Sequence, residues 1–357
     1  MPTSPTQGAA FSSSPRLASL DLFRGFTMAA MVMVNNQPGP HPYTQLHHVP
    51  WHGWTFTDLV FPFFLWIAGL AATLSTAKRV ERGEDRGALL AHAFRRFLII
   101  FAIGVALNTL HYDNFRIPGV LQRIALGYFF GTLIYLYLKP VGRLVTVFAL
   151  FAVYTIGMHP GGYELGDNFA QRIDSLLLSG RLYRDGTWDP EGVWSTLPSI
   201  ATFLFGAFTG DLLRSAREAS NKLQWMLGGG LLLLVLGLAL DPGQPINKAL
   251  WTVPYVFLTA GLASITFGFC YWLVDLRGAK GAWLQFFTIF GLNALAVYIF
   301  HFILGAVFGK SGLQDSVFNA FLGAGPQNAA LFYSLIHVAA SFLFAWFLWN
   351  RRWFLKI

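Results

Sequence analysis

Long apolar stretches, each near the length of a membrane-spanning helix, recur along almost the whole chain, with short polar segments between them. They cover residues 18–36, 54–77, 93–110, 117–138, 141–158, 193–213, 223–240, 250–274, 282–308 and 328–350. A bilayer core requires about 20 apolar residues per helix. The pattern therefore predicts an all-α, polytopic membrane protein with about ten transmembrane helices.

The start of the chain has a different composition. Residues 1–15 are rich in Ser, Pro and small side chains, which is typical of disorder. We expect a disordered cytoplasmic tail there and a single transmembrane domain over residues 16–357. The first apolar stretch contains Asp21 and Arg24 and lacks the plan of a cleavable signal peptide, so we expect it to form the first helix. A short helix is expected near 167–178, within the longest loop.

Charge supports this picture and gives an orientation. Charged residues make up 12% of the chain, about half of the roughly 25% found in soluble proteins. Most Lys and Arg lie in alternate loops, and the other loops contain only Arg116, Arg172, Arg181, Arg184, Lys248 and Lys310. Because cytoplasmic loops are enriched in Lys and Arg, we expect both termini in the cytoplasm. We therefore attribute the net charge of +8 to the orientation signals in the cytoplasmic loops and not to nucleic-acid binding.

Ionisable side chains inside a bilayer are costly and usually face a cavity or a partner. In the first stretch, Arg24 and Asn35 return to nearly the same helix face, and Asp21 lies one turn before Arg24. This polar line has two interpretations. Asp21 and Arg24 form a pair at the membrane interface, or the whole face lines a substrate cavity.

Histidines near the second stretch are candidates for chemistry. His47, His48 and His52 lie in loop 37–53, and Asp58 follows at the start of the stretch. A metal site is disfavoured because the chain has no HExxH pair and only one cysteine, Cys270. A histidine base oriented by Asp58 is better supported, and surface histidines in a polar loop are the alternative.

Other polar residues lie at or within predicted helices. They are Gln122 and Arg123, Asn247 and Lys248, and Asn293 and His301. Arg123 either lines a site or extends its charged end to the membrane surface. Asn293 and His301 require a partner or water at their depth.

Six ordered segments resemble a known family. They are SLDLFRGFTMAAMVMVNN, HHVPWHGWTFTDLVFPFFLWIAGLAATLS, GVLQRIALGYF, WDPEGVWSTLPSI, INKALWTVPYV and FGLNALAVYIFHF. Together they resemble the transmembrane acetyltransferases, the family of lysosomal heparan-α-glucosaminide N-acetyltransferase and its bacterial NagX-like relatives. The chain lacks the extra luminal N-terminal domain of the lysosomal enzyme, so we expect the bacterial branch and the inner membrane.

The resemblance implies transfer of acetyl from cytosolic acetyl-CoA to the amine of a glucosamine-type sugar on the periplasmic side, without a metal, by a homodimer. The family's active-site histidine matches His48 and its asparagine matches Asn35, with Asp58 as the third expected catalytic residue. Residues in the matched segments expected to bind the co-substrate are Asp21, Arg24, Gln122, Arg123, Asn247, Lys248, Asn293 and His301.

Alternatives remain at this stage. A sugar transporter of the N-acetylglucosamine type would also use many helices and a polar interior, and LDLFRG also resembles the start of membrane O-acyltransferases. For an N-acetyltransferase, the residues are compatible with direct transfer and with an acetyl-histidine intermediate.

Overall fold

The computed structural model describes residues 17–39, 42–112, 115–183 and 186–355, and these residues form helices and loops without a β-strand. The helices are α1 (Ala18–Asn35), η1 (Thr44–Leu46), α2 (Phe56–Glu81), α3 (Arg86–His111), α4 (Val120–Tyr137), α5 (Pro140–Met158), α6 (Phe169–Leu178), α7 (Thr196–Arg214), α8 (Ala219–Leu240), α9 (Val253–Tyr271), η3 (Trp272–Leu276), α10 (Ala282–Leu292), α11 (Ala294–Lys310), α12 (Leu313–Phe321), η4 (Leu322–Ala324) and α13 (Pro326–Asn350). The expected tail, residues 1–15, lies outside the described residues.

The predicted all-α membrane architecture is confirmed. By length and composition, 8 of the described helices are able to cross a membrane, or 9 when the bent pair α10–α11 counts as one span. The remaining expected span corresponds to α1, which has 18 residues and contains Asp21 and Arg24. The short helix expected near 167–178 is present as α6.

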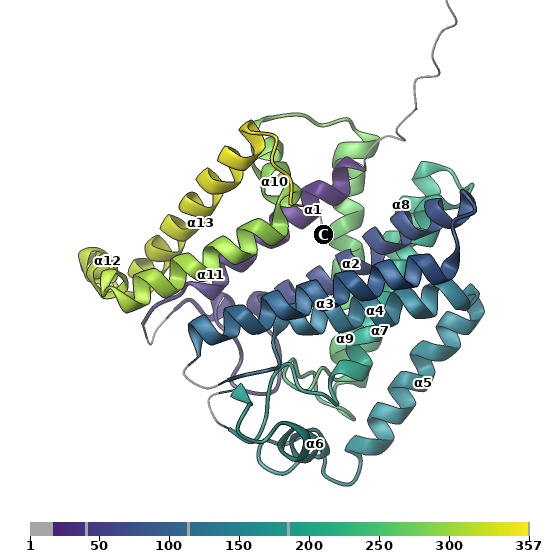
Figure 1. Cartoon of the computed structure of the whole chain (residues 1–357), viewed down its shortest axis with the longest axis horizontal. Coiled ribbons are helices and arrows are strands. Elements are labelled where there is room, and N and C mark those ends of the chain that lie inside the picture. Colours follow the sequence, from purple (N-terminus) through teal and green to yellow (C-terminus); the bar gives the residue numbers. More distant parts are fainter. Residues whose placement is uncertain (1–16, 40–41, 113–114, 184–185, 356–357) are drawn as a thin grey trace, which may run out of the picture.

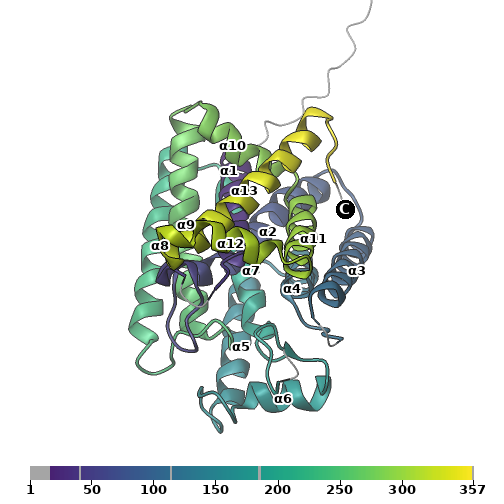
Figure 2. The same ribbon diagram turned by 90° about the vertical axis from the view of Figure 1, so that its left-hand side faces the viewer.

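Central and peripheral helices differ in burial. In α2, 67% of the most apolar window is buried inside the protein, against 17% in α8 and 22% in α3. Figure 1 shows α2 in the middle of the molecule, α8 and α5 at its edge, and α6 beyond the helix ends. Turned by 90°, the start of α1 and the end of α13 lie at one end of the bundle and α6 lies at the other (Figure 2). The first and the last described helices therefore have these two ends on the same side of the bundle.

Glycines allow the central helices to approach closely. A Cβ on Gly69 of α2 would lie 1.9 Å from the carbonyl oxygen of Phe203 in α7, and one on Gly206 would lie 1.9 Å from that of Trp66. Gly25 of α1 faces α10 in the same way. Small residues are the usual means of tight helix packing in membranes, and here they hold the middle of α2 against the middle of α7.

The stretch 282–308, expected as one span, consists of two helices. Asn293 separates α10 from α11, and the two axes differ by 84°. Its side-chain amide donates to the carbonyl oxygen of Trp353 and its Oδ1 accepts from the backbone N–H of Leu355. An Asn side chain competes with helical backbone hydrogen bonds, and here it binds the returning C-terminal segment instead.

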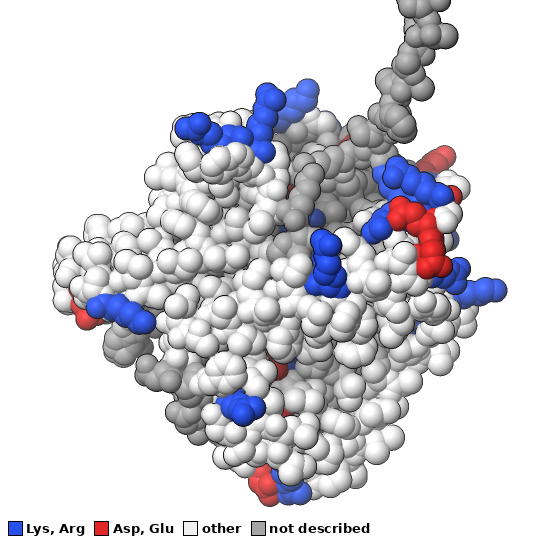
Figure 3. Space-filling model, viewed as in Figure 1, with Lys and Arg blue, Asp and Glu red and all other residues white. Residues whose placement is uncertain are grey.

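Basic residues are concentrated at one end of the bundle. Figure 3 shows Lys and Arg along the upper and right-hand rim, over the α2–α3 turn and the end of α13, and few near α6 and α12. Arg184, one of the basic residues assigned to the outer loops, lies outside the described residues. We call the basic end the inner side and the α6 end the outer side. That the inner side faces the cytoplasm stays a prediction.

Candidate active site

Asp58 lies at the third position of α2, and it is buried with 1% of its surface exposed. Its Oδ2 accepts hydrogen bonds from the backbone N–H and the hydroxyl of Thr55, the residue before the helix. This is one half of a capping box, and the helix N-terminus favours a negative charge there. The local sequence TFTD, residues 55–58, is therefore sufficient to orient the carboxylate of Asp58 at the start of α2.

His48 contacts the second oxygen of this carboxylate. Its Nδ1 lies 2.6 Å from Oδ1 of Asp58, so Nδ1 carries the hydrogen and Nε2 keeps its lone pair. The Nζ of Lys248 lies 3.1 Å from both ring nitrogens and 3.8 Å from Oδ1 of Asp58. Burial and then the charge of Lys248 lower the pKa of His48, while Asp58 raises it, and the net shift is downward. His48 is thus a neutral, oriented base at neutral pH.

Asn247 positions the turn that bears Lys248. It is fully buried, donates to the carbonyl oxygen of Trp51 and accepts from the backbone N–H of Leu250. Its amide also lies 3.2 Å from Nδ1 of His52, whose Nε2 faces Glu164. The ring of His52 therefore faces other partners than the ring of His48.

An outer cavity of about 420 Å³ opens beside His48. Asn35, at the end of α1, lies exposed on its wall, and its side chain makes no hydrogen bond within the described part of the chain. The other polar lining residues include Asn36, Thr57, Asp58, Asn108, His111, Tyr112, Arg116, Gln122, Tyr183, Glu191, Lys248, Tyr298 and His301. The wall therefore offers a base, a free amide and charges of both signs.

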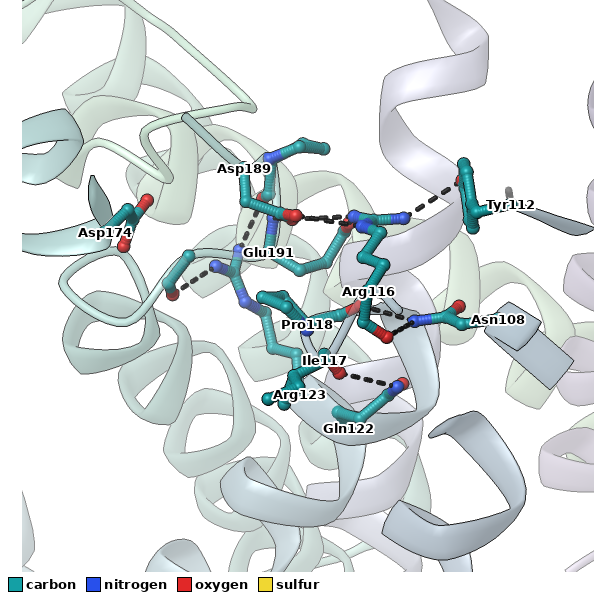
Figure 4. Close-up of polar contacts among 12 residues, drawn as sticks. Asn108, Tyr112, Arg116, Ile117, Pro118, Gln122, Arg123, Asp174, Asp189 and Glu191 are labelled. Atoms are coloured by element: carbon teal, nitrogen blue, oxygen red, sulfur yellow. Dashed lines mark hydrogen bonds and ion pairs between the residues drawn. The ribbon is translucent and has the colours of Figure 1, made fainter. Parts of the chain in front are cut away.

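Arg116 is at the centre of an ion network on this wall, shown in Figure 4. Its Nε and Nη2 donate to both oxygens of Asp189 at 2.8 and 2.6 Å, and Nη2 also lies 2.5 Å from Oε2 of Glu191. Its Nη1 donates to the hydroxyl of Tyr112. Although burial opposes ionisation of Glu191, Arg116 lowers the pKa of this carboxyl. Burial raises the pKa of Tyr112 to about 12.

Gln122 and Arg123, at the start of α4, contact the same loops (Figure 4). Gln122 donates to the carbonyl oxygen of Ile117. Arg123 donates to the carbonyl oxygens of Pro190 and Gly192 and to the hydroxyl of Ser195. Arg123 is 1% exposed and stacks over Trp251. It holds the segment that carries Glu191 rather than lining a cavity itself.

A second cavity, of about 450 Å³, lies on the inner side. Arg24, Arg79, His92 and Arg96 line it. Arg96 stacks over Tyr128, and its Nε is buried without a hydrogen-bond partner among the described residues. Buried polar groups are normally paired, so this orphan donor beside other cations marks a site suited to an anion.

The two cavities meet at a partition. Phe64 of α2, Val120 of α4 and Tyr298 of α11 line both of them. Tyr298 stacks on Phe302, with ring centroids 4.9 Å apart. Three side chains from three helices therefore separate an inner basic cavity from an outer cavity that contains the His48–Asp58 pair.

The residues singled out from the sequence are divided between the two cavities, and some of them line neither. His48, Asn35, Asp58, Gln122, Lys248 and His301 line the outer cavity, Arg24 lines the inner one, and Asp21, Arg123, Asn247 and Asn293 line neither. Asp21 pairs with Arg24 at 3.1 Å, and Nδ1 of His301 lies 2.8 Å from the carbonyl oxygen of Tyr298.

Several site residues escaped the sequence analysis. In the sequence Arg79 and Arg96 look like other basic residues of a cytoplasmic loop, and Glu191 is one of several polar residues in the segment WDPEG. Tyr298 lies within an apolar stretch and looks like any other aromatic residue of a membrane helix. The one sequence signal that pointed to Arg116 was its position as a rare basic residue in an outer loop.

The Arg116 network should be necessary for folding of the outer loops. Arg116→Met leaves two buried carboxylates without their cation, which should cost about 3–5 kcal/mol and lower the thermal midpoint in detergent. Arg172→Met is the matched control, because Arg172 pairs with Asp167 in full solvent, and it should leave the midpoint unchanged. Equal midpoints for the two variants would contradict this account.

Comparisons with known proteins identify a family. A family model described as "Heparan-alpha-glucosaminide N-acetyltransferase, catalytic" matches residues 16–238. The chain is 28% identical over 413 residues to heparan-alpha-glucosaminide N-acetyltransferase of Mus musculus, covering 97% of the chain and 61% of that protein. For the Homo sapiens protein of the same name the identity is 28% over 411 residues, covering 96% of the chain and 60% of that protein.

The chain thus spans about three fifths of the length of these curated relatives. The match with the relatives includes the segments that bear Asn35, His48, Asp58, Glu191 and Lys248, because it extends over nearly the whole chain. On the evidence of the family match, the chain belongs to the catalytic family of heparan-alpha-glucosaminide N-acetyltransferase.

Proposed function

We propose that the protein transfers acetyl from cytosolic acetyl-CoA to the amine of a glucosamine-type sugar on the periplasmic side of a bacterial inner membrane. The observation that carries the proposal is the oriented His48–Asp58 pair in an outer cavity that lies back to back with a basic inner cavity. Membership of the acetyltransferase family supports the reaction class. A homodimer, expected from the resemblance, is part of the same proposal.

The inner cavity suits the nucleotide end of acetyl-CoA. The phosphates of CoA are anionic, and Arg79, His92 and Arg96 line this cavity at the basic end of the bundle. Arginine binds phosphate through charge-assisted, often bidentate hydrogen bonds, and Arg96 has a donor without a partner in the described structure. The pantetheine arm would then extend past the partition towards His48.

The outer cavity suits the reaction itself. The sugar nitrogen attacks the thioester carbonyl carbon while Nε2 of His48 accepts the proton. The amide of Asn35, which has no hydrogen-bond partner among the residues that the structure describes, lines the same cavity and supplies a hydrogen-bond donor for the oxyanion. Removing one such donor typically costs 10²–10³ in rate. When the C–S bond breaks, His48 returns its proton to the sulfur of CoA.

Sugar acceptance also has a physical basis on the outer wall. Glu191 provides a carboxylate, and Tyr112, Tyr183 and Asn108 provide polar groups at the same cavity. Carboxylates and amides are the usual partners of amine and hydroxyl groups. The relatives are named for glucosaminide, and we propose an acceptor of that type.

The first experiment measures transfer of labelled acetyl from acetyl-CoA to glucosamine by the purified protein. His48→Ala should lower kcat/KM by about 10²–10⁴, the usual worth of a general base. His47→Ala is the matched control, because His47 is exposed and lines neither cavity, and it should retain wild-type activity.

Other results would contradict the proposal in distinguishable ways. A folded wild type that binds acetyl-CoA without acetylating glucosamine would have a different acceptor, such as a sugar hydroxyl. A wild type that binds sugar but no acetyl-CoA would be a transporter.

A second prediction concerns the inner cavity. Arg96→Met should raise the KM for acetyl-CoA by roughly tenfold to a hundredfold, because a hydrogen bond to a charged group is worth about 1.5–3 kcal/mol. The KM for glucosamine should stay unchanged. Arg95→Met is the control, since the neighbouring Arg95 is exposed and outside both cavities. Equal effects of the two substitutions would place the nucleotide elsewhere.

A third prediction concerns pH. The charge of Lys248 lowers the pKa of His48 and the charge of Asp58 raises it. Lys248→Met should therefore raise the pKa of His48 and move the acid limb of the kcat/KM profile to higher pH. Asp58→Asn should move this limb to lower pH, with a lower plateau. Lys310→Met, an exposed control, should leave the limb in place, and shifts of the same sign in the first two variants would refute the assignment.

A further inference from the structure

Lys248 is held in place by its neighbours in the turn between α8 and α9. Asn247, directly before it, is fully buried and bonds to Trp51 and Leu250. Trp251, three positions on, is fully buried and has φ of 52°, a region that residues other than glycine rarely adopt. Such backbone strain persists only where the surroundings determine the conformation, so this turn presents Lys248 to the outer cavity in a defined position.

The amine of Lys248 lies within contact distance of the base that would deprotonate an acceptor amine. A general base has to be within about 2.6–3.2 Å of the nitrogen that it deprotonates. The Nζ of Lys248 lies 3.1 Å from each ring nitrogen of His48. Of the two, Nε2 is the one left available, because Nδ1 contacts Asp58. Lys248 also lines the cavity that contains Asn35. The base, the oxyanion donor and an amine are thus assembled without any sugar.

Lys248 is also in an environment that favours a nucleophilic amine. Burial lowers its pKa, and Arg123 lowers it further, whereas Asp58 and Glu191 raise it, with a net shift downward. These groups, with His48, are the titratable and charged groups that face Lys248 from the loop before α2, from α2, from α4 and from the loop before α7. A lowered pKa increases the neutral fraction of the amine, and only that form attacks a carbonyl.

We propose that Lys248 is an acetylation site that the protein modifies itself when acetyl-CoA is bound and the acceptor is absent. The inference rests on the proposed function, because it requires the thioester to reach His48. The neutral Nζ attacks the thioester carbonyl carbon, His48 accepts a proton from Nζ, and the C–S bond breaks. His48 then protonates the sulfur of CoA. The products are Nε-acetyl-Lys248 and CoA.

The modified side chain would act as an inhibitor within the site. Acetylation removes the positive charge of Lys248 and adds a group to the wall of a cavity of about 420 Å³. The amide is stable and does not pass its acetyl group to a sugar. An acceptor sugar should therefore protect Lys248 by occupying the position beside Nε2 of His48.

The test uses the full-length purified protein in detergent with isotopically labelled acetyl-CoA, with and without glucosamine. Chymotryptic peptides analysed by mass spectrometry should show label on Lys248 far above that on Lys310, an exposed lysine of the same chain. The rate of labelling should rise with pH as the amine loses its proton. Glucosamine should suppress it, and His48→Ala should lower it by about 10²–10⁴-fold.

The same samples separate the two proposals. Acetylated glucosamine without label on Lys248 would overturn the self-acetylation and leave the proposed function intact. Label on Lys248 that matches Lys310, or that persists in His48→Ala, would show simple chemical acetylation and would also overturn it. No transfer to either amine would refute both.

Discussion

The contact between His48 and Asp58 is the interaction on which the outer half of the molecule depends. A buried carboxylate is costly unless each oxygen is paired. Oδ2 is paired with Thr55 at the start of α2, and Oδ1 is paired with His48 and approached by Lys248. The hydroxyl of Tyr255 in α9 donates to the backbone carbonyl of Asp58 at 2.5 Å. One residue thus joins the start of α2 to loop 47–55, to the turn before α9 and to α9 itself.

Beside the outer cavity, buried arginines need hydrogen-bond partners just as the buried carboxylate of Asp58 does. Arg116 and Arg123 are 4% and 1% exposed, and burying a guanidinium requires acceptors for its donors. Arg116 finds them in Asp189 and Glu191, and Arg123 finds them mainly in backbone carbonyls of the segment Pro190–Gly192. Both arginines therefore fix one short segment, and that segment places Glu191 in the cavity. Rigid support of this kind is what an active-site wall requires.

The sequence was sufficient to predict the recurring apolar helices and the polar side chains that are energetically costly inside a membrane. Long apolar stretches located most of the helices. The cost of polar groups in such stretches singled out Asp58 and Lys248, and the loop histidines together with the family resemblance singled out His48. These three residues do line one cavity. The sequence could not predict that 282–308 breaks at Asn293, because the partners of Asn293 are Trp353 and Leu355, far away in the chain. It also could not separate the inner basic cavity from topology signals, since Arg95 and Arg96 look alike until the fold turns one of them inward.

If the substrates lie on opposite sides of the membrane, as we propose, the arrangement of the two cavities requires no passage for a whole nucleotide. Moving the phosphates of CoA across a bilayer core would expose several charges to a medium that penalises each of them. In the proposed function the inner cavity holds the charged end, and Phe64, Val120 and Tyr298 line both this cavity and the outer one. In the mechanism that we propose, an uncharged thioester arm passes these side chains while the charges stay beside Arg96.

Tyr298 lies early in α11, just beyond the break at Asn293, so the partition is built partly on a helix whose start is fixed by the C-terminal segment at the inner side. The break at Asn293 was not predicted from the apolar pattern, yet it sets the direction of α11 and so the position of Tyr298 in the partition. A helix that continued straight on from α10 would run in another direction.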